Sequence, residues 1–441
     1  MTLYSEIFYS SEVAGLFSDR NFVTLMLRVE SALARAQAMH GLVPDEAAGI
    51  IADCCNADRI DFEKLGTGIK LGGNAAIPLV GQLTRMVHEK SPEASKYVHL
   101  GATSQDVMDT AMVLLIQDFI GWVEGKLALL EKTLVATTRK HRSTLMIGRT
   151  LLQQARPITF GLKTAGWLES ISRSGERISE AKKRVPVVQL SGAVGSGNTF
   201  ISKDVQATFA RLLGLQPARS WHTHRDNFAE FAAVLGILAG SLAKIATDVV
   251  LLMQTEVGEV FEGAAEGKGG SSTMPHKRNP VTCAAVLANT HRIPHLVASI
   301  LSAMPQEHER SAGLWHSEWE TLADIMQLTA GALDRSIELT EGLEADEKRM
   351  LQNLELTNGL IYAENVSLAL APALGKAPAH ELVEKACQTA VARGEHLKKV
   401  LTDIHIDLSN KELDELFKPE NSIGFSLEII DAVLQKFESN P

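Results

Sequence analysis

The chain has 441 residues, in which 43 Lys and Arg are set against 53 Asp and Glu, giving a formal net charge of −10. This acidic balance excludes a strongly basic nucleic-acid-binding protein. Hydrophobic residues make up 45% and charged residues 22%, which is typical of a globular protein with a large core and excludes intrinsic disorder. At roughly 150 residues per domain, the length predicts about three domains or lobes.

Cysteine usage and the N-terminal sequence favour the cytoplasm. Four cysteines lie in no pattern of a secreted disulfide framework: Cys54, Cys55, Cys283 and Cys387. The N-terminal residues carry acidic side chains where an export signal has basic and then apolar ones. The most apolar stretch, Phe231 to Ala243, is followed by Lys244 and Asp248 and is shorter than the ~20 apolar residues that span a bilayer. We expect no membrane segment.

Helical periodicity dominates from end to end, so the predicted class is all-α. Residues 1–100 carry short amphipathic patterns and predict an N-terminal helical lobe. Residues 101–342 predict a central bundle of very long helices, which includes a loop at 267–280. Beyond about Leu343 the patterns are short again, so 343–441 predict a small C-terminal helical lobe.

Three stretches predict the long helices, at about 105–141, 155–184 and 225–262. The third carries a heptad seam of apolar residues: Phe228, Phe231, Leu235, Leu238, Leu242, Ile245, Val249 and Leu252. At ~1.5 Å per residue such helices are several times longer than the mean globular helix. Each presents more apolar surface than the bundle of one chain can hide, so we expect packing against other copies and a homo-oligomer.

The stretch GKGGSSTMPHKRNP, residues 267–280, falls between helical patterns and predicts a loop. Asn279 suits a helix N-cap and Pro280 suits the first helical position. Hydroxyl groups, the cations Lys277 and Arg278 and the N–H groups of a helix terminus gather there, and such a place attracts anions.

The nucleotide-binding loops do not match. Lys268 is followed by glycine, whereas the Walker phosphate-binding loop has Ser or Thr after its lysine, so the sequence does not match that motif. The strand that should precede a dinucleotide fingerprint around Gly192, Gly195 and Gly197 is also missing from the sequence pattern.

Residues 270–280, GSSTMPHKRNP, resemble the signature of the fumarase/aspartase superfamily. GATSQD at 101–106 and GRTLLQ at 148–153 resemble its other two regions, in the expected order. The resemblance covers nearly the whole chain. It implies that the long helices assemble into a multi-helix tetramer core, in which residues from three subunits form each active site.

Members of that superfamily make or break a bond β to a carboxylate through a carbanion whose charge spreads into that carboxylate. Preorganised donors aimed at this charge are the largest catalytic term available. The resemblance implies that Ser271 exchanges the proton with the α-carbon, and that Lys277 and backbone N–H groups stabilise its oxyanion. Lys277 and Asn279 would also hold substrate carboxylate. No metal or cofactor is required.

Two departures narrow the choice within the superfamily. Thr150-Leu151 stands where adenylosuccinate, argininosuccinate and fumarate enzymes have Thr-His, and Asn74 lies where adenylosuccinate lyases have a His-Asp pair. The two imidazoles that would assist a departing amine are therefore absent. A carboxylate needs no proton to leave. A reaction that forms or opens an internal lactone therefore does not need these two imidazoles.

Residues 72–80, 221–223 and 308–316 resemble the bacterial 3-carboxy-cis,cis-muconate cycloisomerases of protocatechuate (β-ketoadipate) breakdown. The implied reaction adds a substrate carboxylate to the substrate's own double bond and gives 4-carboxymuconolactone, while Ser271 delivers a proton to the adjacent carbon.

The resemblance also assigns substrate-binding positions. Those that hydrogen-bond substrate carboxylates are Thr103, Ser104, Thr150 and Gln153. Arg310 could add a bidentate clamp. Because the substrate carries three carboxylates, an acidic chain must concentrate positive charge locally, and Lys277, Arg278 and Arg310 are the candidates.

The histidines do not indicate a metal site. His222 and His224 lack the companions of a structural zinc site, so polar or substrate-facing roles are favoured. The roles of His222, His276, His308 and His316 stay open. Thr103 and Ser104 could also simply cap a helix, and the two roles can coexist.

Two other functions compete. An adenylosuccinate-type lyase is disfavoured by Leu151 and Asn74. A catalytically silent helical scaffold is disfavoured by the retention of Ser271, Lys277 and Asn279.

Overall fold

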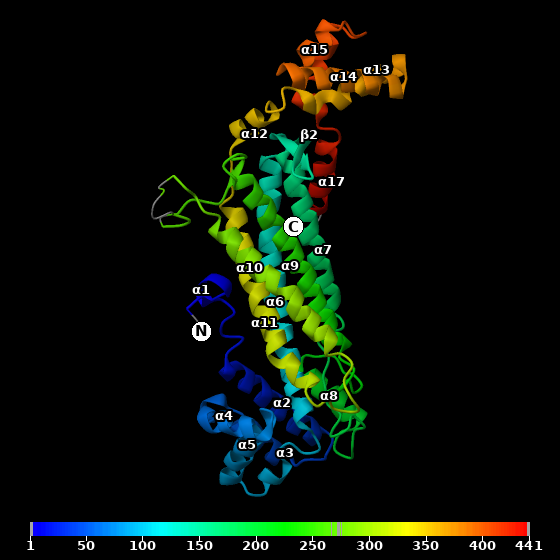
Figure 1. The fold of residues 1–441 in the computed structure, drawn as a ribbon. Helices are drawn as coiled ribbons and strands as arrows, with labels where there is room; N and C mark the ends of the chain where they lie inside the picture. The colour runs from blue at the N-terminus through cyan, green and yellow to red at the C-terminus, as the bar shows by residue number, and fades with distance from the viewer. Residues whose placement is uncertain (1–2, 266, 271–273, 275, 439–441) are drawn as a thin grey trace. The chain divides into compact units, whose positions relative to one another are not determined.

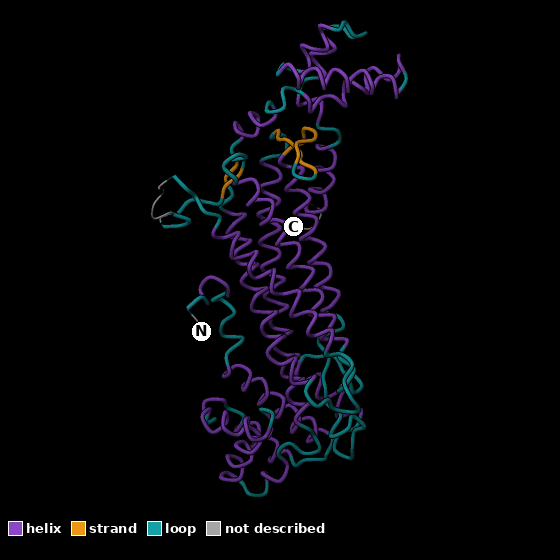
Figure 2. The backbone as a smooth tube through the Cα atoms, viewed as in Figure 1, coloured by secondary structure: helices purple, strands orange, loops and turns teal. Residues whose placement is uncertain are grey.

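The computed structural model describes residues 3–265, 267–270, 274 and 276–438. Helices dominate and the strands are few and short, which confirms the predicted all-α class (Figures 1 and 2). The chain divides into two compact units. Unit 1 comprises Met1–Leu127, Arg173–Leu242 and Ala285–Asp334, and unit 2 comprises Ala128–Ser172, Ala243–Ala284 and Arg335–Pro441. The three-lobe division at residues 100 and 343 stays a prediction.

Five long helices carry residues of both units, because each boundary between the units falls inside one of them. They are α6 (Ser104–Lys140), α7 (Phe160–Lys182), α9 (Asp226–Met253), α10 (Val281–Ser302) and α11 (Leu314–Glu341). Within unit 1, the rings of Phe119 on α6 and Phe231 on α9 meet edge to face, with centroids 6.4 Å apart. Within unit 2, Trp167 on α7 donates its indole N–H to Asp248 on α9 at 2.8 Å. Segments of the same helices therefore pack together inside each unit.

The heptad seam of α9 is buried as predicted: Phe228, Phe231, Leu235, Leu238, Leu242, Ile245, Val249 and Leu252. By length and composition α9 is also apolar enough to cross a membrane. A core helix passes the same test, and burial of this seam is what the heptad pattern predicts.

Of the remaining helices of unit 1, α2 has 21 residues and the others have 15 or fewer. The full set is α1 (Ser5–Phe8), α2 (Asp19–Met39), α3 (Asp45–Cys54), α4 (Phe62–Gly72), α5 (Ala76–Lys90) and α8 (Lys203–Leu213), with the 3-10 helices η1 (Ala57–Arg59) and η2 (Ala94–Tyr97). Helix α2 packs against α3 and α8. Ser18 caps α2 by accepting a hydrogen bond from the Asn21 N–H at 3.2 Å.

Unit 2 contains a hairpin where the sequence predicted the start of a helix at Ala155. Strands β1 (Leu145–Thr150) and β2 (Gln153–Thr159) pair antiparallel, with Thr150 opposite Gln153, and helix α7 begins only at Phe160. The ladder is irregular at Gly148, where a Cβ atom would lie 2.9 Å from the carbonyl oxygen of Arg156. A second short pair joins β3 (Val260–Phe261) to β4 (Glu344–Ala345).

The C-terminal part of unit 2 is built from short helices. They are α12 (Glu347–Leu354), α13 (Ala363–Leu374), α14 (Lys376–Arg393), α15 (Leu397–Asp403), α16 (Asn410–Leu416) and α17 (Ser426–Glu438), with η3 (Leu360–Tyr362) and η4 (Pro419–Ser422). Helices α13 to α16 share an apolar core that includes Val366, Val383 and Leu401.

Candidate active site

The loop before α10 is closed at its base by backbone pairing. The N–H of Asn279 donates to the carbonyl of Gly269 at 2.9 Å. Gly269 has φ +65°, and a Cβ there would lie 2.6 Å from the Asn279 carbonyl oxygen, so this position needs glycine. Lys277, which is exposed, and Asn279 lie on the returning side of the loop. Ser271 lies outside the described residues.

Arg278, one of the three cations that the sequence offers for the substrate, bonds instead to residues at the base of this loop. It donates to the carbonyl of Glu262 at 2.6 Å and to the carboxylate of Glu344 at 3.1 Å, and it lies over the ring of Phe261. The hydrogen bond from Arg278 lowers the pKa of Glu344 below its ordinary value. Arg278 therefore ties the loop to the β3–β4 pair.

The sequence suggested that the Asn279 side chain caps the N-terminus of α10. In the structure, Glu262 caps it instead. The Glu262 carboxylate accepts hydrogen bonds from the N–H groups of Thr282 at 3.1 Å and Cys283 at 2.7 Å. The N–H groups of Val281 and Ala284 bond to backbone carbonyls. All four N–H groups of the first turn are thus satisfied, so this terminus offers none of them to an external anion.

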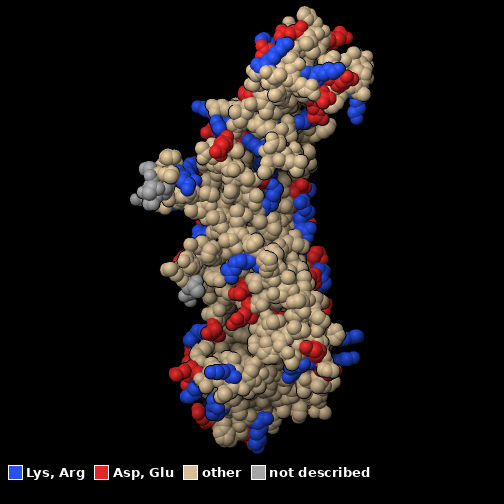
Figure 3. Space-filling view, in the orientation of Figure 1, with Lys and Arg blue, Asp and Glu red and all other residues tan. Residues whose placement is uncertain are grey.

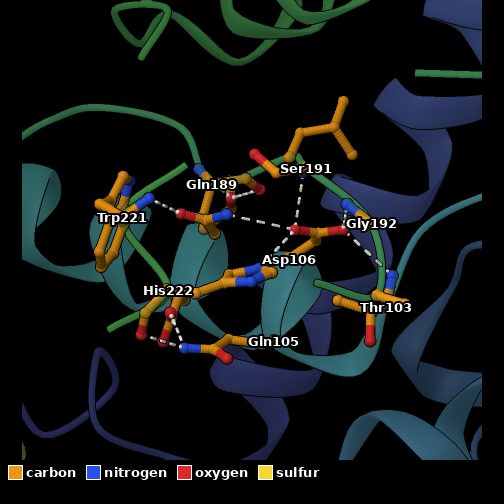
Figure 4. A network of polar contacts seen from close by, with 12 residues as sticks. Thr103, Gln105, Asp106, Gln189, Ser191, Gly192, Trp221 and His222 are labelled. Atoms are coloured by element: carbon orange, nitrogen blue, oxygen red, sulfur yellow. Dashed lines mark hydrogen bonds and ion pairs between the residues drawn. The ribbon is translucent and has the colours of Figure 1, made fainter. Parts of the chain in front are cut away.

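The start of α6 is built around the buried carboxylate of Asp106 (Figure 4). Its oxygens accept hydrogen bonds from the backbone N–H groups of Ser191 and Gly192, each at 2.9 Å, and of Thr103 at 3.1 Å. Nε2 of His222 lies 3.2 Å from the same carboxylate. Asp106 therefore holds the 189–192 segment and the 221–222 segment against the GATSQD turn.

Arg310 and Thr103, two predicted substrate-binding residues, are in direct contact. Nη2 of Arg310 donates to the Thr103 hydroxyl at 2.9 Å and to the carbonyl of Ala193 at 3.0 Å. Its Nε donates to the side-chain oxygen of Gln105 at 3.1 Å. Because Nε and Nη2 are engaged, these two atoms cannot together bind a carboxylate in this arrangement. Nη1 has no hydrogen-bond acceptor among the described residues and remains available to a ligand.

Beneath this turn lies a buried ionic cluster of Asp109, Arg225 and Glu318. Arg225 donates to Asp109 at 2.6 and 3.1 Å and to Glu318 at 2.5 and 3.0 Å. Burial alone would lower the pKa of Arg225, but the two carboxylates raise it above its ordinary value. Burial raises the pKa of Glu318 to about 7, since Arg225 opposes the shift only in part and Asp109 adds to it.

In unit 2, Arg149 and Glu259 anchor the β1–β2 hairpin. Thr150 and Gln153 are paired across its tip and are exposed. Between them, Leu151 (φ +50°) and Leu152 (φ +64°) adopt the left-handed conformation of a two-residue hairpin turn. Leu151 is 96% exposed and Leu152 is 75% exposed in the single chain. Two leucines in a conformation that costs about 1 kcal/mol each mark this tip as a position held for a reason other than local stability.

His222 and His316 differ in their exposure to solvent. His222 is buried and structural in its contacts with Asp106. His316 is exposed and packs its ring against Trp315 and Trp319, with centroids 5.4 and 4.6 Å apart. Among the described residues, no group of three or more His, Cys, Asp or Glu side chains is arranged to hold a metal ion.

Positive and negative side chains are mixed on the surface shown in Figure 3, so that face as a whole does not attract anions. On the face drawn in Figure 3, the described Lys and Arg side chains are interspersed with Asp and Glu. Ion pairs account for many of the cations, such as Lys268 with Glu338 at 2.8 Å. A polyanionic ligand would therefore have to be held by a few nearby cations and not by a uniformly positive face.

Sequence reasoning missed the carboxylates that build the site: Asp106, Asp109, Glu259, Glu262 and Glu318. They are buried acidic residues inside apolar helical or strand-flanking patterns. Charged residues are almost never fully buried without a partner, so an acidic residue at a core-facing position is the signal that could have found them.

Comparison with known proteins gives a family. A sequence model described as "Lyase" matches residues 9–294, and one described as "Adenylosuccinate lyase C-terminus" matches residues 359–433. The chain is 49% identical to a 3-carboxy-cis,cis-muconate cycloisomerase of Pseudomonas putida, covering 93% of this chain and 99% of that one. It is 47% identical to the enzyme of that name from Acinetobacter baylyi, covering 98% of each chain.

The chain belongs to the fumarase/aspartase superfamily of lyases. A crystal structure of the 3-carboxy-cis,cis-muconate lactonizing enzyme from Pseudomonas putida has the same fold, with a TM-score of 0.94, 46% identity and 99% of each chain covered. The expected superfamily membership is thus confirmed. Of the residues that the sequence predicts for the site, Thr103, Ser104 and Arg310 lie in unit 1, and Thr150, Gln153, Lys277 and Asn279 lie in unit 2.

Proposed function

We propose that this chain converts 3-carboxy-cis,cis-muconate to 4-carboxymuconolactone by intramolecular addition of a carboxylate, in protocatechuate catabolism. The observation that supports this most strongly is the likeness, over almost the whole of both chains, to enzymes that carry the cycloisomerase name. The chemistry of the residues agrees with it, because Leu151 stands where other branches carry a histidine and a departing or attacking carboxylate needs no such acid.

The proposed reaction balances without a cofactor. One carboxylate oxygen forms a C–O bond with the carbon β to a second carboxylate, and the π electrons move into that carboxylate. The Ser271 hydroxyl then gives its proton to the α-carbon, and water returns a proton to the serine. Three carboxylates become two and a lactone, with one proton taken from solvent.

The charge that develops needs donors already in place. Lys277 and Asn279, on the returning side of the loop closed at Gly269, are the proposed donors to the carboxylate that accepts the electrons. Thr103, Ser104, Thr150 and Gln153 are the proposed hydrogen-bonding partners of the remaining carboxylates, and Arg310 offers them Nη1.

We infer that the active protein is a homotetramer with shared active sites. The support is the hairpin tip of Leu151 and Leu152, since apolar side chains exposed to 96% and 75% are expected to be covered by another copy. Sedimentation at micromolar concentration should give four copies, and a monomer alone would refute the inference. The four free thiols Cys54, Cys55, Cys283 and Cys387 agree with a cytoplasmic location.

An ultraviolet assay tests the proposed function directly. Purified protein should consume the conjugated diene of 3-carboxy-cis,cis-muconate and release 4-carboxymuconolactone. The match of residues 359–433 to the C-terminus of adenylosuccinate lyases makes adenylosuccinate the comparison substrate. Cleavage of adenylosuccinate without turnover of carboxymuconate would replace the proposal, and inactivity on both would favour the silent scaffold.

A further inference from the structure

Gln105 connects the exposed Arg310 to the buried ionic cluster. It is fully buried in the first turn of α6, so it does not reach a ligand itself. Its side-chain oxygen accepts the Nε–H of Arg310 at 3.1 Å. Its Nε2 donates to the carboxylate of Asp109 at 3.1 Å and to the carbonyl of His222 at 2.8 Å. Three of the amide's bonding directions are therefore used by three different segments.

The orientation of this amide is dictated by its surroundings. Asp109 is paired with Arg225 and also accepts the indole N–H of Trp315 at 3.0 Å, so its oxygens act as acceptors. If the amide were rotated by half a turn, its oxygen would face Asp109 and a carbonyl, while its NH₂ group would face a guanidinium. Every contact would then be repulsive. The buried cluster thus forces the Gln105 oxygen toward Arg310.

The consequence for Arg310 is a fixed guanidinium plane. Gln105, the Thr103 hydroxyl and the Ala193 carbonyl engage its Nε and Nη2 atoms. In the part of the chain that the structure describes, nothing accepts a hydrogen bond from Nη1, so its two N–H groups remain available to a ligand. A side chain with many rotamers is thereby reduced to one direction before any ligand arrives, which lowers the entropic cost of binding.

We propose that Gln105 is a positioning residue: it aims Nη1 of Arg310 at a carboxylate of the substrate, with Asp109, Arg225 and Glu318 as its support. This inference rests on the proposed function, in which Arg310 holds a carboxylate. Gln105 acts through Arg310 and touches no substrate. Its removal therefore weakens substrate binding more than it slows the chemical step, and it matters only while Arg310 is present.

A double-mutant cycle tests this. Gln105→Met keeps the volume and removes the amide, and Arg310→Ala removes the group that Gln105 is proposed to aim. KM for 3-carboxy-cis,cis-muconate should rise about tenfold in Gln105→Met, with kcat within about threefold of wild type, because one oriented charge-assisted bond is lost. In the Arg310→Ala background the same change should alter kcat/KM by less than about twofold.

Gln306→Met is the matched control. Gln306 also donates its amide N–H to the cluster, to Glu318 at 2.9 Å, and it has no hydrogen bond to Arg310. Its variant should keep KM within about twofold, the range expected of a site that does not couple to the ligand. Equal effects of the two Gln→Met changes would overturn the inference, as would effects of Gln105→Met and Arg310→Ala that multiply in the double variant.

Two additions keep the test decisive. If Gln105→Met does not fold, Gln105→Asn retains a buried amide near Asp109 but is one methylene too short to reach Arg310, and it should raise KM likewise. If the wild type binds but does not turn over, the cycle is read from binding of tricarballylate, an unreactive tricarboxylate. That result would refute the proposed reaction while still deciding the role of Gln105. Loss of both turnover and binding would reject both.

Discussion

Arg149 and Glu259 form a bidentate ion pair next to the tip of the β1–β2 hairpin, with Nη1–Oε2 2.8 Å and Nη2–Oε1 2.7 Å. Glu259 is fully buried and also accepts the side-chain N–H of Asn353 at 2.7 Å. Asn353 in turn accepts, at its carbonyl, a hydrogen bond from Gln154 at 3.1 Å. The hairpin that presents Thr150 and Gln153 is thus held on both strands by one buried network.

Breaking this pair should be costly. Arg149→Ala leaves the Glu259 carboxylate buried with a single amide donor, so we expect the free energy of unfolding to fall by about 3 kcal/mol. Urea or thermal unfolding measures it. Arg139→Ala is the control, since Arg139 pairs with Glu438 at 3.0 Å where both side chains are more than half exposed, and its loss should cost below about 1 kcal/mol. Equal losses in the two variants would contradict the assigned role of Glu259.

The cap of α10 gives a second expectation. Glu262→Ala removes the acceptor of the Thr282 and Cys283 N–H groups, and the free energy of unfolding should fall by about 1–2 kcal/mol. Asn279→Ala should change stability by less than about 0.5 kcal/mol, because its side chain does not cap the helix. Chemical denaturation of both variants compares them, and the reverse order of losses would show that Asn279 is the cap.

Glu318 predicts a pH dependence of stability. Its folded pKa of about 7 lies above the ordinary 4.5, so between these values the folded state binds more protons than the unfolded state. The contribution of this group to stability therefore falls as the pH rises from about 4.5 to 7, by on the order of 1–3 kcal/mol.

Glu318→Gln removes this titration and keeps the shape of the side chain. The decline in melting temperature between pH 5 and 7 should be shallower in the variant than in the wild type. Gln306→Met, which loses a bond to Glu318 without removing its carboxyl group, should retain a decline of its own. Parallel curves for wild type and Glu318→Gln would show that Glu318 does not titrate in this range.

Ser271 carries the proposed proton transfer. Ser271→Ala should lower kcat by about 10²–10⁴-fold, the usual contribution of a positioned proton donor, while the oligomer persists. Turnover of carboxymuconate and sedimentation of the same sample measure the two properties. Unchanged turnover with an intact oligomer would rule out this serine as the donor.

The fold class and the core of α9 followed from periodicity. Phe228 to Leu252 recur at steps of three and four, and burial follows because an apolar stripe on a helix must be covered. The same reasoning failed at Ala155. The hairpin there depends on pairing with Leu145 to Thr150 across an irregular ladder, and residues 155–159 alone do not show it.

The candidate site divides in the same way. The segments GATSQD, GRTLLQ and GSSTMPHKRNP could be found in the sequence because each is contiguous. These segments indicated the superfamily, which the comparisons confirm, and led to the proposed reaction. Which residues support them could not be found. Arg225 meets Asp109 from 116 positions away and Glu318 from 93, and Arg310 meets Gln105 from 205.

The amino-acid sequence by itself therefore determined the helical class, the α9 seam and the contiguous segments proposed for the chemistry. Only the tertiary structure decided that Glu262 caps α10, that Arg278 bonds to Glu262 and Glu344, and that Gln105 hydrogen-bonds to Arg310. The physical reason is that helix periodicity and motif spacing are local properties of the chain. The partner of a buried charge is set by which distant segments fold against it.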